Sequence, residues 1–404
     1  MPIRRATGPA SLVLLISSCF LPASVAAGGA VPAAGSSDRA KTQAVIDVLQ
    51  QWYVPETGLY RTTGWWNSAN AVTALANFSR ITQSTKYLPE FANTLSAAQR
   101  KPDGAPGFVN DYYDDEGWWA LAWIDVYDLT RDRKYLRMAD SIFADMKRGW
   151  ETDTCGGGVW WSKKTREKNA IENELFLDVA ASLANREDDA AQRADDLGWA
   201  KEEWTWFSGT GMINGDHLIN DGLDSSDPKH CTNNGRNTWT YNQGVILGAL
   251  VELNRAAPDA GLIQTAHEIA LAAISHLADE HGVLRENGNA HTGGDVPQFK
   301  GIFVRNLMVL NRVSQDGKFR EFADANARSA WDHDRDAANH FGFWWAGPFD
   351  QADAARQSSA VDLFVAAEAM DAEAAASGLT GNSPAPNENS ARPDAFNPAR
   401  KQPR

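Results

Sequence analysis

The sequence is poor in cysteine and in positive charge. It contains 3 Cys, and its 38 Lys and Arg are outnumbered by 52 Asp and Glu, which gives a formal net charge of −14. Because nucleic-acid-binding surfaces need excess positive charge, we expect no nucleic-acid partner. Beyond the N-terminal segment only Cys155 and Cys231 remain, and in an oxidising compartment they are either one disulfide or two unpaired thiols.

Motifs for phosphate, metal and serine-hydrolase chemistry are also missing. The sequence has no Gly-x-Gly-x-x-Gly after a strand pattern, no phosphate-binding lysine loop, no Gly-x-Ser-x-Gly and no His-Glu-x-x-His. Its 8 His form no ligand pattern, and the acids at positions 216, 221, 224 and 227 lack the intervals of an EF-hand. We therefore expect no cofactor and no metal ion, which leaves carboxylate chemistry.

Long apolar runs are absent except at residues 12–21, which follow two arginines. Small residues come next, so residues 1–27 are typical of a signal peptide cleaved after Ala26 or Ala27. A competing interpretation, lipid attachment at Cys19, fits less well because apolar residues follow that cysteine directly. No other run approaches the roughly 20 apolar residues of a transmembrane helix. The sequence thus predicts a secreted or periplasmic protein without a transmembrane segment.

Helical periodicity and an internal repeat dominate what is present. Apolar residues recur three and four positions apart, and no long stretch alternates with a period of two, which predicts an all-α fold. The pattern T-x3-K-Y-L at 82–88 returns at 130–136, 48 residues later, and a related S-x3-K-F begins at Ser314. A repeat of just under fifty residues is typical of stacked helical hairpins.

The repeat and the helical pattern together predict about a dozen helices. We expect them near 40–53, 65–82, 86–99, 114–130, 134–149, 170–184, 189–208, 241–256, 261–279, 298–314, 318–335 and 356–376. Every second one, starting near 65, is the more apolar of its pair, which favours a closed (α/α)6 barrel over an open solenoid. We expect one monomeric barrel domain over 28–375 and a disordered tail over 376–404, which is rich in Pro, Asn and Ser.

The sharpest polar feature is the adjacent pair Asp114 and Asp115, which stands where a loop enters one of the apolar helices. Adjacent helical side chains diverge by roughly 100°, so the two carboxylates can approach one small group from two directions. This arrangement suits a nucleophile beside a proton donor. The alternative is an N-cap aspartate followed by a first-turn acid, as in ordinary helices. The flanking Tyr113, Trp118 and Trp119 and the burial of an inner helix favour the functional interpretation.

Tryptophan is unusually frequent, with 16 Trp against 8 Tyr, and it occurs as doublets at 65–66, 118–119, 160–161 and 344–345. Indole rings stack on the apolar faces of sugars, although any single Trp is more often part of a core. Polar side chains also gather near the starts of the apolar helices, where amides often serve only as caps or backbone partners. These residues are Asn67, Asn70, Asn173, Asp221, Tyr241, Gln243 and Lys300.

Six strings then identify a known family by resemblance. The chain resembles glycoside hydrolase family 76 in YYDDEGWWALAW (112–123), GGGVWW (156–161), KNAIENELF (168–176), TYNQGVILGAL (240–250), FKGIFVRNL (299–307) and QSSAVDLF (357–364). The strings occur in order along about 340 residues. The family contains endo-α-1,6-mannanases with an (α/α)6 barrel, which agrees with the repeat.

The resemblance implies that Asp114 is the nucleophile and Asp115 the general acid/base of a retaining, two-step cleavage of α-1,6-mannosidic linkages. Retention generally needs carboxyl groups about 5–5.5 Å apart. The resemblance also implies α-mannan as the partner molecule, bound by Asn67, Asn173, Asp221, Tyr241 and Gln243. We add Asn70, Tyr113, Trp118, Trp119 and Lys300 as substrate-binding candidates.

Two departures from the family pattern stand out. Glu116 and Gly117 follow the Asp pair where many members have other small or polar residues, and a hydrophobic C-terminal tail for a lipid anchor is lacking. The second departure favours hydrolysis over transglycosylation of anchored glycans. Other enzymes on this barrel include unsaturated-uronyl hydrolases and epimerases, but the His pair that an epimerase needs does not stand out. A mannan-binding protein without catalysis would keep the aromatic residues and would not need both aspartates.

Overall fold

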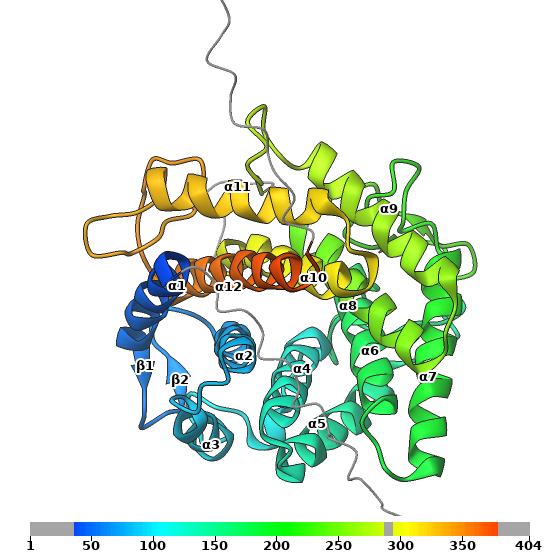
Figure 1. The fold of residues 1–404 in the computed structure, drawn as a ribbon. Coiled ribbons are helices and arrows are strands. Elements are labelled where there is room, and N and C mark those ends of the chain that lie inside the picture. Colours follow the sequence, from blue (N-terminus) through cyan, green and yellow to red (C-terminus); the bar gives the residue numbers. More distant parts are fainter. Residues whose placement is uncertain (1–35, 287–293, 379–404) are drawn as a thin grey trace, which may run out of the picture.

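The computed structural model describes residues 36–286 and 294–378, and within them the regular secondary structure is almost entirely helical (Figure 1). The expected signal peptide and Cys19 lie outside these residues, as does the expected tail beyond residue 378. The helices are α1 Ser36–Leu49, α2 Trp65–Thr82, α3 Leu88–Ala97, α4 Tyr113–Thr130, α5 Arg133–Met146, α6 Ala170–Ala184, α7 Ala190–Gly209, α8 Thr240–Ala256, α9 Ala260–His276, α10 Phe299–Ser314, α11 Gly317–His333 and α12 Ala354–Ala376.

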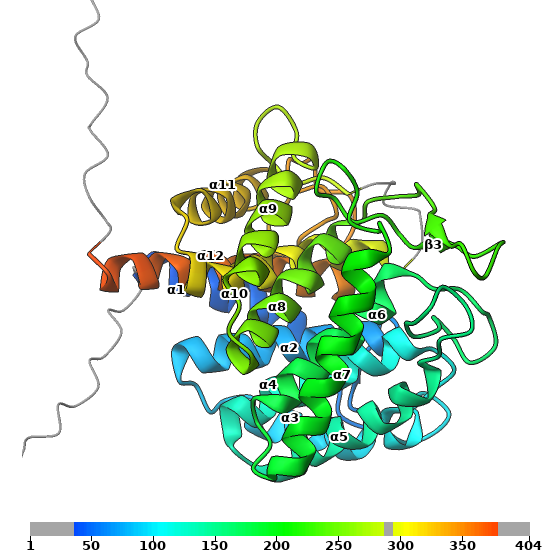
Figure 2. The same ribbon diagram turned by 90° about the vertical axis from the view of Figure 1, so that its right-hand side faces the viewer.

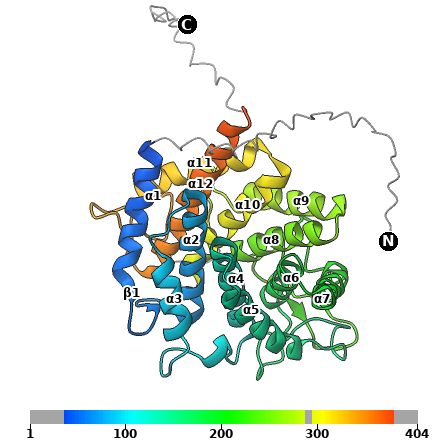
Figure 3. The same ribbon diagram turned by 60° about the horizontal axis from the view of Figure 1, so that its bottom comes forward.

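The even-numbered helices form a closed inner ring. Each packs on the next along the series α2, α4, α6, α8, α10 and α12, and α12 packs on α2 to complete the circle. The outer helices lie against them, with α5 on α4, α7 on α6, α9 on α8, and α1 and α11 on α12 (Figures 2 and 3). This arrangement confirms the expected all-α (α/α)6 barrel.

Inner helices are buried on nearly all sides, as every residue of α6 illustrates. Two glycines permit their close approach. A Cβ on Gly244 would lie 2.6 Å from the Cα of Phe303 on α10, and one on Gly301 would lie 2.6 Å from the Cα of Ser359 on α12. Since real Cβ atoms do not approach so closely, a larger residue at either position would push neighbouring inner helices apart.

The repeated T-x3-K motif marks turns from an inner to an outer helix. In each copy the second residue, Gln83, Arg131 or Gln315, has a positive φ of 55°, 58° or 46° and ends the inner helix. In two copies the next residue is an aspartate, Asp132 or Asp316, whose side chain caps the outer helix. The repeat therefore encodes the turn geometry at one end of the barrel.

At the opposite end, longer loops lead from each outer helix to the next inner one. Several are closed by isolated antiparallel bridges and fixed by an amide side chain that accepts from the backbone N–H of the bridge residue. These contacts are Asn173 with Val159 at 2.6 Å, Gln243 with Ile219 at 2.8 Å, Asn326 with Leu284 at 2.8 Å and Gln357 with Phe341 at 3.0 Å. The loops at this end are thus held in place by the barrel.

The helical periodicity does not indicate the short strands. Two hairpins of two-residue strands are present, β1 Tyr53–Val54 with β2 Leu59–Tyr60 and β3 Leu223–Asp224 with β4 Thr232–Asn233. The first hairpin explains why α1 ends at Leu49 and not near residue 53, because a 3-10 turn over Gln50–Trp52 leads into β1. Strands of this length are too short to show alternation. None of the described helices has the length and apolar character needed to span a bilayer.

Candidate active site

The two adjacent aspartates lie in the first turn of α4, at the barrel end where the inner helices begin. The backbone N–H of Tyr113 donates to the carbonyl of Trp161 at 3.0 Å, and the N–H of Lys163 donates to the carbonyl of Asp111 at 2.9 Å. These bonds join the segment before α4 to residues 161–163. The same short ladder thereby sets the position of both carboxylates.

Asp114 and Asp115 have different neighbours. Trp161 Nε1–H donates to Asp114 Oδ2 at 3.0 Å, whereas Asp114 Oδ1 is buried without a hydrogen-bond partner in the described part of the chain. Asp115 Oδ2 accepts from the Asn110 side-chain amide at 2.6 Å. Burial raises the pKa of Asp114 to about 6 against the opposing effect of the Trp161 bond. Burial, and then the charge of Asp114, raises the pKa of Asp115 well above its usual value.

A third carboxylate, Asp295, also faces the pair. It lies immediately before the short 3-10 helix η4 Val296–Gln298, and its charge raises the pKa of both Asp114 and Asp115. The indole N–H of Trp66 donates to Asp295 Oδ1 at 2.9 Å. Sequence reasoning missed this residue because only the closed ring brings the start of α10 beside α2 and α4.

Aromatic rings form a stack across the same end of the barrel. Trp66 stacks on Trp118 with centroids 5.6 Å apart, Trp118 on Tyr241 at 6.4 Å, and Tyr241 on Phe299 at 3.8 Å. Trp66 and Tyr241 are half-buried, so they present part of their surface to the mouth. Trp119, by contrast, is fully buried among core aromatics. The structure therefore brings Trp118 and Tyr241 together with the Asp pair and separates Trp119 from it.

Most of the polar residues expected to bind sugar are engaged within the protein. Asn67 accepts from the N–H of Gly64 at 3.0 Å and donates to Gln298 at 2.7 Å. Asn173 and Gln243 fix the loops described above, and Asn70 accepts from Arg305 at 2.7 Å. Such amide side chains make the hydrogen bonds that buried backbone groups and helix ends need. The sequence alone does not distinguish this structural role from contact with a ligand.

Of the remaining candidates, Lys300 and Tyr113 are buried within the protein, whereas Asp221 and Tyr241 are partly exposed. Lys300 is buried, donates to the carbonyl of Phe343 and lies 4.4 Å from the ring centroid of Trp345. Tyr113 is buried beneath the ammonium of Lys163. Asp221 stays partly exposed, and its charge and that of Asp114 act on Tyr241, whose pKa burial raises well above its usual value. Tyr241 thus lies within the electrostatic influence of both Asp221 and Asp114.

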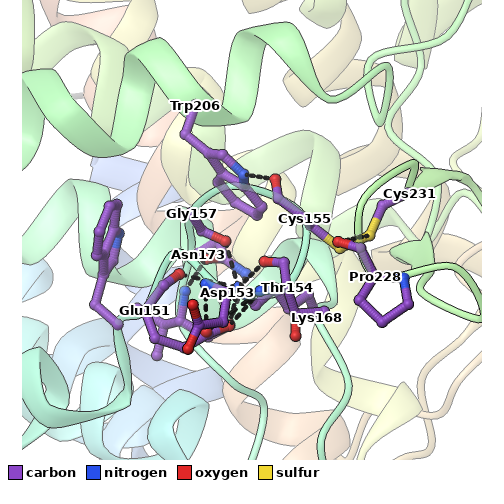
Figure 4. A network of polar contacts seen from close by, with 12 residues as sticks. Glu151, Asp153, Thr154, Cys155, Gly157, Lys168, Asn173, Trp206, Pro228 and Cys231 are labelled. Atoms are coloured by element: carbon purple, nitrogen blue, oxygen red, sulfur yellow. Dashed lines mark hydrogen bonds and ion pairs between the residues drawn. A yellow bond between two sulfur atoms is a disulfide. The ribbon is translucent and has the colours of Figure 1, made fainter.

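The loop that carries Trp161 is anchored by a buried lysine and a disulfide (Figure 4). Lys168 donates to the carbonyls of Thr154 at 2.6 Å, Glu151 at 3.2 Å and Gly157, and it pairs with the Glu151 carboxylate at 2.7 Å. Cys155 is bonded to Cys231 with a Cα–Cα distance of 5.2 Å, which resolves the alternative left open by the sequence. Sequence reasoning missed Lys168 because only its burial, at 0% exposure, distinguishes it from a surface lysine.

In the ranges 36–286 and 294–378, no group of three or more His, Cys, Asp and Glu side chains is arranged to hold a metal ion.

A model of the family described as glycosyl hydrolase family 76 matches residues 37–378, which is most of the chain. The chain belongs to glycosyl hydrolase family 76.

Within family 76 the chain is similar to proteins from fungi and bacteria. The mannan endo-1,6-alpha-mannosidase DFG5 of Candida albicans is 24% identical over 289 residues, 66% of this chain and 63% of that protein, so the chain spans less than two thirds of its length. The alpha-1,6-mannanase of Salegentibacter sp. HEL1_6 has a solved structure with a TM-score of 0.74 and 26% identity, covering 82% of this chain and 99% of the other. An inactive variant of that mannanase, in which two adjacent aspartates are replaced by asparagine, has been solved with alpha-1,6-mannotriose.

Proposed function

We propose that this chain is an endo-acting hydrolase of α-1,6-mannan. The observation that carries the proposal is the pair of adjacent carboxylates in unlike surroundings, beside an aromatic stack at the mouth of the barrel. Keeping Asp114 Oδ1 buried without a partner costs stability, and such groups are retained where they do chemistry. A mannan-binding protein would have no need of this arrangement.

The similar proteins, which include an alpha-1,6-mannanase, support the choice of substrate and indicate which pair of aspartates carries the chemistry. The inactive Salegentibacter variants carry replacements at two adjacent aspartates, and this chain has three such pairs, at 114–115, 188–189 and 195–196. Asp189 caps the outer helix α7, and Asp195 and Asp196 lie within that helix. Only the pair at 114–115 stands on an inner helix at the mouth. It is therefore the pair to which we assign the chemistry.

In the proposed mechanism Asp114 attacks the anomeric carbon, and the bond to the leaving sugar oxygen breaks as that oxygen takes the proton of Asp115. Water then attacks the mannosyl-enzyme, gives its proton to Asp115 and frees Asp114. The Trp161 bond stabilises the ionised form of Asp114, while burial and the Asp114 charge raise the pKa of Asp115 and keep its proton in place. These unlike surroundings support the assignment of nucleophile and acid.

The test is incubation of residues 28–404 with unbranched α-1,6-mannan, followed by chromatography of the products. The double variant Asp114→Asn/Asp115→Asn is the control. A ladder of oligosaccharides from the native protein alone supports an endo-hydrolase. Binding by both proteins without cleavage would mean a mannan-binding module, and longer products from added oligosaccharides would mean transglycosylation.

We further propose export by residues 1–27, tested by N-terminal sequencing of protein recovered outside the cytoplasm.

The pH profile provides a separate prediction. Activity requires ionised Asp114 and protonated Asp115, so we expect a bell-shaped kcat/KM with an acid limb at about pH 6. Trp161→Phe removes a donor that favours the ionised form, which raises the pKa of Asp114 and moves the acid limb up by about one pH unit. Trp160→Phe is the control, because Trp161 and not Trp160 donates to Asp114. An unmoved limb in Trp161→Phe would contradict the assigned role.

A further inference from the structure

Asn110 connects Asp115, the proposed acid, to a charged cluster formed by Glu116, Lys163 and Asp145. Its backbone N–H donates to Glu116 Oε1 at 3.2 Å, and its carbonyl accepts from Lys163 Nζ at 2.6 Å. Its side-chain Oδ1 accepts from the backbone N–H of Tyr112 at 2.8 Å, and its Nδ2 donates to Asp115 Oδ2 at 2.6 Å. All four polar groups of Asn110 are therefore engaged.

These contacts fix the orientation of the Asn110 amide. A backbone N–H can only donate, so the group facing Tyr112 must be the amide oxygen, and the NH₂ group must face Asp115. The carbonyl oxygen of a carboxylic acid is a stronger acceptor than its hydroxyl oxygen, so this bond favours Oδ2 as the carbonyl oxygen of protonated Asp115 and Oδ1 as the oxygen that carries the proton. One donor thereby favours one direction in which the acid delivers its proton.

The charged cluster fixes the Asn110 peptide from two sides. Glu116, with 0% exposure, binds its N–H, and Lys163 binds its carbonyl. Lys163 Nζ also lies 2.6 Å from Glu116 Oε1 and 2.5 Å from Asp145 Oδ2 on α5. Burial raises the pKa of Glu116, the residue that departs from the family pattern, to about 8 against the opposing effect of this pairing.

We propose that Lys163 is a positioning residue that acts through Asn110 to orient the acid proton of Asp115. The inference rests on the proposed function, because orientation of a proton matters only if Asp115 delivers it. The titratable groups that face Asp115 are Asp114, Asp295 and Glu116, and those that face Lys163 are Glu116, Asp145 and Asp111. Among residues 36–286 and 294–378, Asn110 is the group that donates a hydrogen bond to the Asp115 carboxyl group.

The test compares two substrates whose leaving groups need different amounts of protonation. We expect Lys163→Met to lower kcat/KM on α-1,6-mannan by about 10- to 100-fold, because the acid is misplaced. The loss on the nitrophenyl glycoside of α-1,6-mannobiose should be under about threefold, since nitrophenolate departs without a proton. Lys164→Met, at an exposed neighbour that pairs with Asp111, should leave both values unchanged.

A double-mutant cycle provides the second measurement. Because Lys163 acts through Asn110, Asn110→Ala should show the same leaving-group dependence, and adding Lys163→Met should lower kcat/KM no further. Equal losses on both substrates, or losses that multiply in the double variant, would overturn the proposal. If Lys163→Met does not fold, Lys163→Gln takes its place, and its loss must again be larger on mannan. Failure of the native protein to cleave either substrate would instead reject the proposed function.

Discussion

Replacing Asp114 with asparagine is expected to reduce kcat/KM on α-1,6-mannan by about 10⁴-fold or more, as loss of a nucleophile does in other covalent mechanisms. The amide is nearly isosteric and still accepts from the Trp161 indole, so the fold and substrate binding should persist. Because the missing step is attack on the sugar, the loss should be equally large for the nitrophenyl glycoside of α-1,6-mannobiose. Initial rates on both substrates, with calorimetric binding of mannotriose as the folding control, measure this.

Asp115→Asn should behave differently, and the difference separates the two roles. Loss of a general acid costs about 10²–10⁴-fold where the leaving group needs a proton, so the loss of kcat/KM should be large on mannan and small on the nitrophenyl substrate. If Asp114→Asn instead showed the leaving-group dependence and Asp115→Asn did not, the nucleophile and the acid would be exchanged. Equal behaviour of the two variants would contradict the assignment of separate roles.

The inner helices were predictable because their signals are local. The T-x3-K repeat indicates a left-handed turn at Gln83, Arg131 and Gln315, and the apolar composition of α6 and α8 indicates burial on nearly all sides. Each signal lies within one turn or one helix, so it can be read without knowledge of the partner. Six such pairs are compatible with an open solenoid or a closed ring, and the apolar character of every second helix favours the closed ring, in which α12 packs on α2.

The environment of the Asp pair was less predictable because it is assembled from distant segments. Asp295 lies far along the chain from Asp115, and Lys168 resembles any other lysine until its burial is known. Asn67 and Gln243 are polar residues near helix starts, and the sequence predicts that they bind sugar. A side chain that holds a neighbouring segment by a hydrogen bond has the same local sequence pattern as one that binds a sugar. Composition also gives no indication that Trp118 stacks on Trp66 while Trp119 stacks on Trp123, although both are buried.

The buried lysine of the Trp161 loop leads to the second large effect. Lys168→Met keeps the length of the side chain but removes the donor shared by the carbonyls of Glu151, Thr154 and Gly157. It also leaves the Glu151 carboxylate without its cation. Because three carbonyl groups lose the charged donor they share, while the Glu151 carboxylate is partly exposed to water, we expect the free energy of unfolding to fall by about 3–5 kcal/mol. Urea denaturation followed by tryptophan fluorescence measures the change.

Lys164→Met is the matched control, because Lys164 is on the same segment with a side chain that is 76% exposed and pairs only with the exposed Asp111. A surface pair of this kind contributes at most about 1 kcal/mol. The disulfide between Cys155 and Cys231 still ties the loop to β4 in both variants, so the difference between them isolates the lysine. If Lys168→Met were as stable as Lys164→Met, the loop would be held by the disulfide and Asn173 alone, and Lys168 would have no structural role. If it is destabilised as expected, Lys168 stabilises the loop that carries Trp161, the residue that donates to Asp114.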